Sequence, residues 1–254
     1  MINKILDRFV IILFSISILL VSIWAVIIPI TKSIDFFEYE FNKNNTSENT
    51  GWYVYEDNTY YSYTNEELTY IMDTVIDYLM DEKDDMQVVI NGKNVFSNQA
   101  LIHMKDVKVL YTGGNRLGLM FYVITIICMI YMAFNFDRMK SLLFKYTMLT
   151  LAGILIILGA IGTFALVDFD KVFVLFHKIA FPTEQKFNDA FFSNISNYEE
   201  LYYINNLTLT NILSIEVFMD AVILIFIGIF TTLTSWITFT VFVRKKVKKQ
   251  VLIN

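Results

Sequence analysis

The chain of 254 residues contains only two histidines, His103 and His177. Imidazole is the side chain whose ordinary pKa lies near neutrality, so it can both accept and donate a proton at physiological pH. Each histidine lies a short distance from one end of a long apolar run. The sequence therefore favours general acid–base chemistry at a water–lipid boundary.

His103 falls in a segment with the pattern of an amphipathic helix. Ser97 is a plausible N-cap, and the pattern predicts a helix over 98–111 that ends at Thr112-Gly113-Gly114. His103 shares one face of this helix with Ala100, Val107 and Leu110 by the i, i+3, i+4 rule. Asp106, three residues later, is within reach of the imidazole.

His177 falls in a second, shorter helical segment. Asp168 or Asp170 is the predicted cap of a helix over 171–180, and Pro182 stops it. His177 is flanked by aromatic residues there, because Phe176 precedes it and Phe181 follows one helical turn later.

The region upstream of His103 shows two strong local signals. Thr64-x-x-Glu67 is a capping box before residues at helical spacing, Leu68, Ile71, Met72, Val75 and Leu79. Asn91-Gly92 lies between 87–90 and 93–96, and this dipeptide is typical of a tight hairpin. We therefore expect a small folded α+β region and not an open loop.

Four long apolar runs surround these segments, at 9–30, 117–134, 146–167 and 221–243. Hydrophobic residues make up 56% of the chain, and the mean hydropathy is +0.51. Each run reaches the length of about 18 residues that indicates a transmembrane helix. The only cysteine, Cys128, lies inside the second run, so we expect no internal disulfide.

The distribution of charge predicts the topology. Ten of the 20 basic residues, but only two of the 25 acidic ones, lie before the first run, between the second and third, and after the fourth. The positive-inside rule puts both termini in the cytoplasm. The predicted parts are 1–31 with the first span, an extracytoplasmic cap at 32–116, two spans at 117–167, a second extracytoplasmic segment at 168–216, and the last span with its basic tail at 217–254.

The predicted fold class is therefore a mainly α membrane protein with four transmembrane helices, both termini cytoplasmic, and a small α+β extracytoplasmic cap. The basic tail at 244–249 is interpreted as a topology signal beside anionic lipid and not as a nucleic-acid patch. Asp220 lies at the outer end of the last run, where a helix-start acid is its simplest interpretation. A metal site requires three or four ligands at recognisable spacing, and the sequence has neither a His-Glu-x-x-His nor a Cys-x-x-Cys motif, so we expect no metal.

Several of these motifs together resemble one family. Asn91-Gly92-Lys93, His103-Met104-x-Asp106-Val107-Lys108 and Phe176-His177-x-x-x-Phe181 are similar to the pattern of the bacterial lipoprotein intramolecular transacylases. The resemblance extends to Asp77-Tyr78-Leu79 and, more loosely, to Phe218-Met219-Asp220. Residues 182–187 depart from that pattern, and the second extramembrane segment lacks a tryptophan.

The resemblance implies a reaction and a site. The sn-2 acyl chain of an S-diacylglyceryl cysteine would move to the α-amine of the same cysteine in a lipoprotein substrate, without a cofactor. His103 and His177 are then the expected catalytic pair. Asp106 is the candidate that orients His103, the basic residues Lys108, Arg116 or Lys178 are candidates for holding negative charge, and Phe176 and Phe181 are expected to position substrate.

A second hypothesis is a membrane module without enzymatic activity, whose cap binds or senses a lipid or a peptide. A binding module would retain its ligand unchanged, whereas a transacylase would convert it without an added acyl donor. The sequence alone leaves both hypotheses open, together with the oligomeric state.

Overall fold

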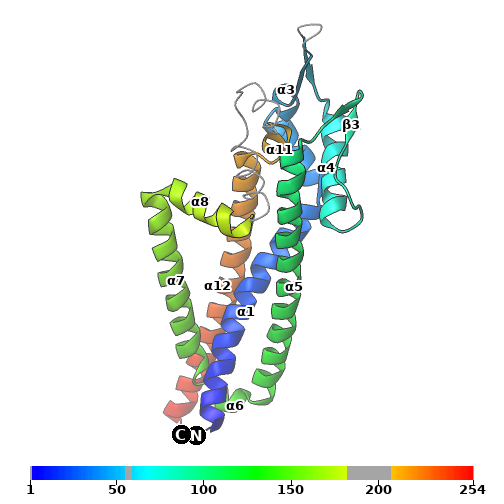
Figure 1. Ribbon diagram of the computed structural model, residues 1–254. Helices are drawn as coiled ribbons and strands as arrows, with labels where there is room; N and C mark the ends of the chain where they lie inside the picture. The colour runs from blue at the N-terminus through cyan, green and yellow to red at the C-terminus, as the bar shows by residue number, and fades with distance from the viewer. Residues whose placement is uncertain (1, 55–58, 182–206, 254) are drawn as a thin grey trace. The chain divides into compact units, whose positions relative to one another are not determined.

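Long helices dominate the computed structural model, which describes residues 2–54, 59–181 and 207–253 (Figure 1). The longest are α1 (Ile2–Lys32), α5 (Asn98–Phe134), α7 (Leu143–Val167) and α12 (Ile215–Ile253). Shorter helices connect or cap them: α2 (Ile34–Lys43), α3 (Thr46–Asn49), α4 (Asn65–Leu79), α6 (Phe136–Met139), α8 (Phe169–Ala180) and α11 (Leu207–Ile212). Two antiparallel hairpins complete the described part, β1 (Gly51–Val54) with β2 (Thr59–Ser62), and β3 (Val89–Ile90) with β4 (Lys93–Asn94).

Three of the helices, α1, α5 and α12, are long and apolar enough to cross a membrane. They contain the first, second and fourth apolar runs of the sequence. The third run falls in α7, which is 25 residues long and includes a shorter apolar stretch, Leu143–Ile157. The described part of the protein is thus mainly helical, as the sequence predicts, with three candidate membrane-spanning helices and a shorter apolar one.

The chain divides into two compact units. The helical unit consists of Met1–Ile27, Asn115–Val172 and Ile223–Asn254. The α+β unit consists of Ile28–Gly114 and Phe173–Val222. Each unit therefore combines stretches that are far apart in the sequence.

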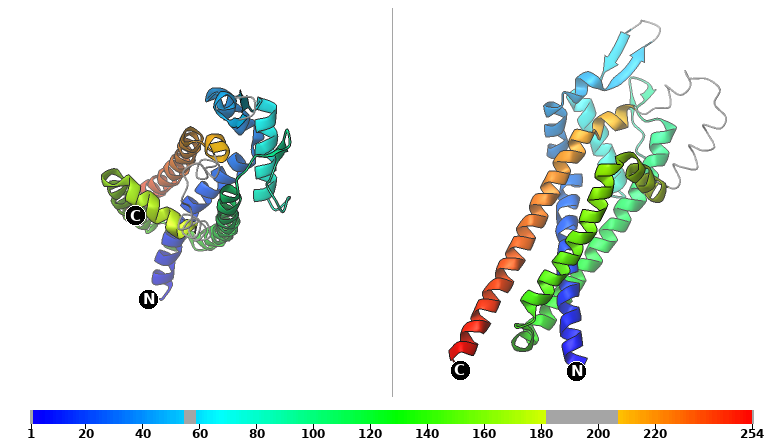
Figure 2. Two further views of the ribbon diagram at one scale, coloured as in Figure 1. Left: turned by 45° about the horizontal axis from the view of Figure 1, so that its top comes forward. Right: turned by 90° about the vertical axis from the view of Figure 1, so that its left-hand side faces the viewer.

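In the helical unit, stretches of α1, α5, α7 and α12 run side by side, and α1 begins at the same end of the unit at which α12 ends (Figures 1 and 2). Their contact is a small apolar core around Ile11, Phe14, Cys128 and Leu143, where the Phe14 and Trp236 rings lie 4.7 Å apart. Close packing also explains Gly118, since a Cβ there would lie 2.2 Å from the Trp24 side chain.

One ionic cluster ties the helical unit together near the start of α1. The carboxylate of Asp7 is fully buried and accepts hydrogen bonds from Arg138 Nε at 2.6 Å, Arg138 Nη2 at 2.8 Å and Tyr131 Oη at 3.0 Å. A buried charge is tolerated only when it is paired and hydrogen-bonded. This network therefore fixes α1 against the end of α5 and the short helix α6.

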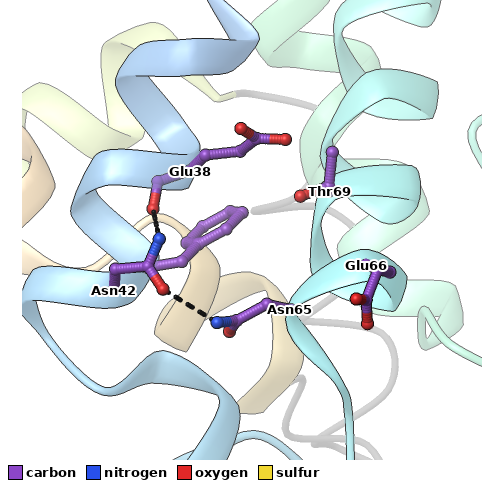
Figure 3. A pocket seen from close by; sticks show the side chains of 6 residues that line it. Glu38, Asn42, Asn65, Glu66 and Thr69 are labelled. Atoms are coloured by element: carbon purple, nitrogen blue, oxygen red, sulfur yellow. Dashed lines mark hydrogen bonds between the residues drawn. The ribbon is translucent and has the colours of Figure 1, made fainter.

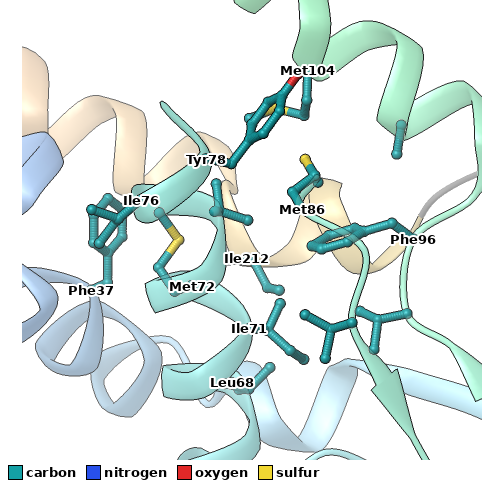
Figure 4. Packing of buried hydrophobic residues seen from close by; sticks show 14 of the residues in the cluster. Phe37, Leu68, Ile71, Met72, Ile76, Tyr78, Met86, Phe96, Met104 and Ile212 are labelled. Carbon is teal, nitrogen blue, oxygen red and sulfur yellow. The ribbon is translucent and has the colours of Figure 1, made fainter. Parts of the chain in front are cut away.

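The α+β unit has its own core, in which the amphipathic helix α4 is central (Figure 4). Leu68, Ile71 and Met72 of α4 are almost completely buried. Side chains from α2, the β3–β4 hairpin, α5 and α11 pack on them, including Phe37, Phe96, Met104 and Ile212. The predicted capping box begins α4, because Thr64 Oγ1 accepts from Glu67 N at 3.2 Å and Glu67 Oε2 accepts from Thr64 N at 2.9 Å.

The predicted Asn-Gly hairpin is confirmed, and its strands are shorter than the apolar pattern indicates. Asn91 and Gly92 have φ values of 50° and 75°, the left-handed conformation that such a turn requires. Beyond the two-residue strands, the Gln87 side-chain amide continues the pairing. It donates to Phe96 O at 2.8 Å and accepts from Phe96 N at 3.0 Å.

The aromatic stretch before α4 forms the β1–β2 hairpin. Trp52 lies opposite Tyr61, and their rings stack with centroids 4.3 Å apart. Gly51 is required at the start of β1, because a Cβ there would lie 1.8 Å from the Tyr61 carbonyl oxygen. Tyr63 directly after β2 is buried, and this burial raises the pKa of its phenol to about 12.

The prediction that a separate helix ends at Thr112-Gly113-Gly114 is wrong. Helix α5 runs without interruption from Asn98 to Phe134. Each glycine destabilises a helix by only about 1 kcal/mol relative to alanine. The favourable free energy of the other residues in a helix of 37 residues outweighs this cost. The boundary between the two compact units nevertheless falls directly after Gly114.

Candidate active site

His103 lies in the second turn of α5. Ser97 begins this helix as predicted, since its Oγ accepts from Ala100 N at 3.2 Å and its carbonyl accepts from Leu101 N at 3.1 Å. Ala100 and Met104 on either side of His103 are buried in the core of the α+β unit. The backbone that carries His103 is therefore fixed by packing, while the imidazole itself is only half-buried.

Phe181 connects His103 to the segment of the second histidine. The centroids of the His103 and Phe181 rings lie 4.6 Å apart, with the planes tilted by 44°. Phe181 is 7% exposed and follows α8 directly. His177 occupies α8 four residues earlier, which is one helical turn. The structure thus brings the end of α8 beside His103.

Of the two predicted caps of α8, Asp168 is the one that the structure shows. Asp168 Oδ1 accepts from Lys171 N at 3.1 Å, and Asp168 Oδ2 forms an ion pair with Lys171 Nζ at 2.5 Å. The helix ends at Ala180, two residues before Pro182. The side chains of Phe176 and His177, and the whole altered stretch 182–187, lie outside the described part of the structure. The convergence of the two imidazoles stays a prediction.

Asp106 is buried on α5, one turn after His103, with 7% of its surface exposed. A carboxylate in such a position requires hydrogen-bond or ionic partners. Burial therefore restricts the Asp106 side chain to a fixed position near the histidine. A group that orients an imidazole has to be fixed in this way. Its direct hydrogen bond to His103 stays a prediction.

Lys108 is occupied by contacts within the α+β unit. Its Nζ forms an ion pair with Asp81 Oδ1 at 2.6 Å and lies 4.3 Å from the centroid of the Tyr78 ring. Burial raises the pKa of Tyr78, and the Lys108 charge partly offsets that rise. Lys108 therefore joins the end of α4 to α5, which connects two of the sequence motifs in space.

The remaining basic candidates are placed differently. Arg116 and Lys178 are both exposed, Arg116 on the part of α5 that belongs to the helical unit and Lys178 on α8. The structure thus brings together His103 and Phe181, and separately Lys108 with Tyr78 and Asp81. Among residues 2–54, 59–181 and 207–253, no group of three or more His, Cys, Asp or Glu side chains could hold a metal ion.

Sequence analysis missed an ionic cluster between α2 and α12. Glu40 is 1% exposed and accepts from Asn44 Nδ2 at 3.2 Å. Lys43 forms ion pairs with Glu40, at 3.5 Å, and with Asp220. Burial is the main cause that raises the pKa of Glu40, and its hydrogen bond to the Asp220 carboxylate adds to the rise. The available signal was a glutamate within the aromatic run 36–41.

The interpretation of Asp220 as a helix-start acid is wrong. Helix α12 begins at Ile215, so Asp220 lies beyond its first turn, where the macrodipole effect has faded. Its ion pair with Lys43 explains why an acid is placed there.

A pocket of about 330 Å³ lies between α2 and α4 (Figure 3). It is lined by Glu38, Phe41, Asn42, Asn65, Glu66 and Thr69. Asn65 Nδ2 donates to Asn42 Oδ1 at 2.8 Å across it, and Asn42 Nδ2 donates to Glu38 O at 2.9 Å. None of the six lining residues is a predicted site residue.

Comparisons with known proteins agree with this fold. The fold matches the membrane integral lipoprotein intramolecular transacylase Lit from Bacillus cereus. A histidine-to-arginine variant of that protein gives a TM-score of 0.68 at 18% identity, over 98% of this chain and 96% of that one. Another of its structures gives a TM-score of 0.64 at 19% identity, over 97% and 99% of the two chains. Identities this low establish the fold alone.

A comparison with curated proteins finds no significant match. The family model described as lipoprotein intramolecular transacylase Lit, however, matches residues 9–188. This stretch contains both histidines and the motifs around them. Since it makes up more than half of the chain, the protein belongs to the lipoprotein intramolecular transacylase family.

Proposed function

We propose that this protein moves the sn-2 acyl chain of an S-diacylglyceryl cysteine to the α-amine of the same cysteine. The observation that carries this proposal beyond family membership is the contact between His103 and Phe181. It supports an arrangement in which the turn that contains His177 lies next to the turn that contains His103. Two imidazoles at one place supply a base and an acid for a proton-transfer reaction near neutral pH.

The reaction requires no second substrate. The α-amine attacks the ester carbonyl carbon, a C–N bond forms, and the C–O bond to the glycerol breaks. The proton that leaves the amine is replaced by one delivered to the glycerol oxygen, so atoms and charge balance. An α-amine has a pKa of about 8 and is mostly protonated at pH 7, which makes a base necessary before attack.

Proximity supplies much of the remaining rate enhancement. The amine and the ester belong to one molecule, and holding two such groups in reacting geometry is worth roughly 7–11 kcal/mol. The protein then has to bind the lipidated cysteine in a conformation that brings the α-amine next to the ester carbonyl carbon. Phe181, and in our proposal Phe176, form an apolar wall for the acyl chain beside the imidazoles.

The roles within the site follow from placement. His103 acts as one partner of the acid–base pair, and His177 acts as the other. Asp106, buried one turn after His103, orients that imidazole. An imidazole held in one orientation can stabilise the oxyanion or deliver a proton to the leaving oxygen.

We further propose that four spans cross the cell membrane and that the α+β unit forms the extracytoplasmic cap. The bias of basic residues supports cytoplasmic termini, and α1 begins where α12 ends within the helical unit. The site then lies at the outer surface, where the ester groups of a membrane-anchored lipoprotein are found.

The proposal is tested with purified protein and a synthetic diacylglyceryl lipopeptide. Mass spectrometry of fragments should locate the acyl chain on nitrogen after incubation, without an added acyl donor. His103→Asn and His177→Asn should each lower the rate by about 10²–10⁴-fold. Lys105→Asn is the matched control, since Lys105 is exposed on the same helix two residues from His103.

Two outcomes would contradict the proposal. If both histidine variants keep the rate of the control, the imidazoles are not the acid–base pair. If the unsubstituted protein binds the lipopeptide and returns it unchanged, the protein is a binding module and not a transacylase.

A further inference from the structure

Helix α8 carries an exposed stripe in which apolar and basic residues alternate. Lys171, Leu175, Lys178 and Ile179 lie at i, i+4, i+7 and i+8, which places them on one side of the helix. Leu175 is 54% exposed and Ile179 is 72% exposed. The Lys171 side chain is 76% exposed although its Nζ pairs with Asp168, and Lys178 is also exposed.

This stripe has the composition of a face that contacts lipid. Large apolar side chains exposed together mark an interaction site. Lysines beside them extend their apolar stems along the lipid and keep the ammonium groups in water, where they attract anionic headgroups. A helix that is apolar and basic on the same side fits a phospholipid surface, because that surface has acyl chains for the apolar side chains and anionic headgroups for the lysines.

The helix that precedes α8 also supports lipid as the partner of the stripe. Helix α7, whose last residue Val167 is 79% exposed, is the apolar helix that immediately precedes α8. At Asp168 the backbone leaves helical geometry, with φ −152° and ψ 78°, and α8 starts at the next residue (Figure 1). Helix α8 therefore starts directly after an apolar helix, within two residues of an exposed apolar side chain.

We propose that α8 lies in the outer lipid–water boundary, with Leu175 and Ile179 among the acyl chains and Lys171 and Lys178 at anionic headgroups. This inference rests on the proposed function for the side of the membrane and for the role of position 177. Position 177 follows Leu175 by two residues, about 200° around the helix. Position 177 therefore falls on the side of the helix opposite to the lipid-bound stripe.

The consequence is a mechanism of substrate positioning. A diacylglyceryl group keeps its ester carbonyls at the lipid–water boundary while its acyl chains stay in the bilayer. A helix that binds at the same depth carries the second histidine at the level of those esters. The substrate would then reach both imidazoles without leaving the membrane surface.

The depth of α8 can be measured directly. Leu175→Cys and Ile179→Cys are made in a Cys128→Ser background, which removes the only native thiol. Each is labelled with an environment-sensitive fluorophore and reconstituted in vesicles of phosphatidylcholine and phosphatidylglycerol. Tyr70→Cys on α4, at a residue that is 57% exposed, is the matched control in the α+β unit.

The expected result is a blue-shifted emission at positions 175 and 179 and stronger quenching by a lipid-borne quencher near the headgroup than by one at the bilayer centre. The label at position 70 should remain in water. Lys171→Gln with Lys178→Gln should weaken the quenching, and the same loss should appear in vesicles without phosphatidylglycerol.

Two results would overturn the inference. Emission at positions 175 and 179 that matches the control would place α8 in water. A blue shift without lipid quenching would mean that a protein surface, such as a second copy of the chain, covers the stripe. Fluorescence does not depend on turnover, so an inactive protein would still give a depth for α8, and the two proposals fail independently.

Discussion

Glu40 is the residue whose ionisation should matter most for stability in the α+β unit. Its pKa is raised above the ordinary value of 4.5, mainly by burial and then by Asp220. Between that value and its pKa in the folded protein, the folded state binds more protons than the unfolded chain. The contribution of Glu40 to stability is therefore complete at low pH and decreases as pH rises through this window, by at most about 1.4 kcal/mol per pH unit.

Glu40→Gln should remove this pH dependence, because the amide stays neutral and still donates a hydrogen bond to Asp220. As the pH rises above 4.5, we expect the midpoint of thermal unfolding to fall less for the variant than for the unsubstituted protein. Glu38→Gln, at an exposed neighbour on the same helix, is the control and should leave the profile unchanged. Parallel profiles for all three proteins would contradict the assignment.

Phe181 is expected to position His103, in addition to its place in the wall for the acyl chain, and not to take part in the proton transfers. Phe181→Ala removes the ring that lies 4.6 Å from the imidazole, and a small misplacement of a catalytic group costs up to about 10²-fold in rate. We expect kcat to fall by about ten- to a hundredfold while the pH–rate profile also shifts. Phe181→Leu, which keeps the residue buried and apolar, should recover part of the rate.

Phe134→Ala is the control for Phe181, since Phe134 ends α5 and is 86% exposed. Loss of rate in Phe181→Ala with an unchanged pH–rate profile would mean that the ring serves only packing.

At the scale of elements, the sequence predicted the structure well where a short motif determines the local backbone conformation. Thr64 and Glu67 cap α4 through two reciprocal hydrogen bonds, and Asn91-Gly92 adopts the positive φ values of its turn. The continuity of α5 could not be predicted from Gly113-Gly114, because a weak local penalty competes with the rest of a long helix. The pairing of Glu40 and Lys43 with Asp220 joins residues about 180 positions apart and has no local signal.

Within α5, the glycines separate into two kinds. A Cβ at Gly113 or Gly114 would meet no atom within 4 Å, whereas at Gly118 it would clash with Trp24. Gly113→Ala and Gly114→Ala should each stabilise the protein, by up to about 1 kcal/mol, through helix propensity. Gly118→Ala should destabilise it by about 1–3 kcal/mol, because extra volume enters a packed contact.

The measurement is thermal unfolding of the three variants in the same detergent. The opposite signs within one helix are the critical result. Destabilisation by Gly113→Ala or Gly114→Ala would mean that α5 is interrupted at the glycine pair, as the sequence alone predicts.

The contact that links distant parts of the helical unit is the Asp7 network. Asp7→Asn removes the charged partner of Arg138 and replaces a buried carboxylate that accepts three hydrogen bonds by an amide that can accept with only one of its two terminal atoms. We expect a large fall in the midpoint of unfolding. Asp137→Asn provides the control, because the Asp137 side chain is 94% exposed in its pair with Lys140, and its loss should have little effect. Equal effects of the two variants would exclude a structural role for the network.

At the scale of the whole molecule, the distribution of charge makes the most direct prediction. The described residues provide one exposed position on each predicted side of the membrane, Tyr70 on α4 and Ser141 between α6 and α7. In a Cys128→Ser background, Tyr70→Cys should react with a membrane-impermeant maleimide in intact cells. Ser141→Cys should react only after the membrane is permeabilised.

This pair of variants tests the orientation from both sides, so that a failure of labelling at one position is not mistaken for burial. The physical reason for the expected result is the basic character of the 135–145 connection, where Arg138, Lys140 and Lys145 outnumber Asp137. Such a short loop stays on the cytoplasmic side. Reaction of Ser141→Cys in intact cells would show that the orientation is the opposite of the predicted one. The proposed site would then face the cytoplasm, away from a lipoprotein substrate at the outer surface.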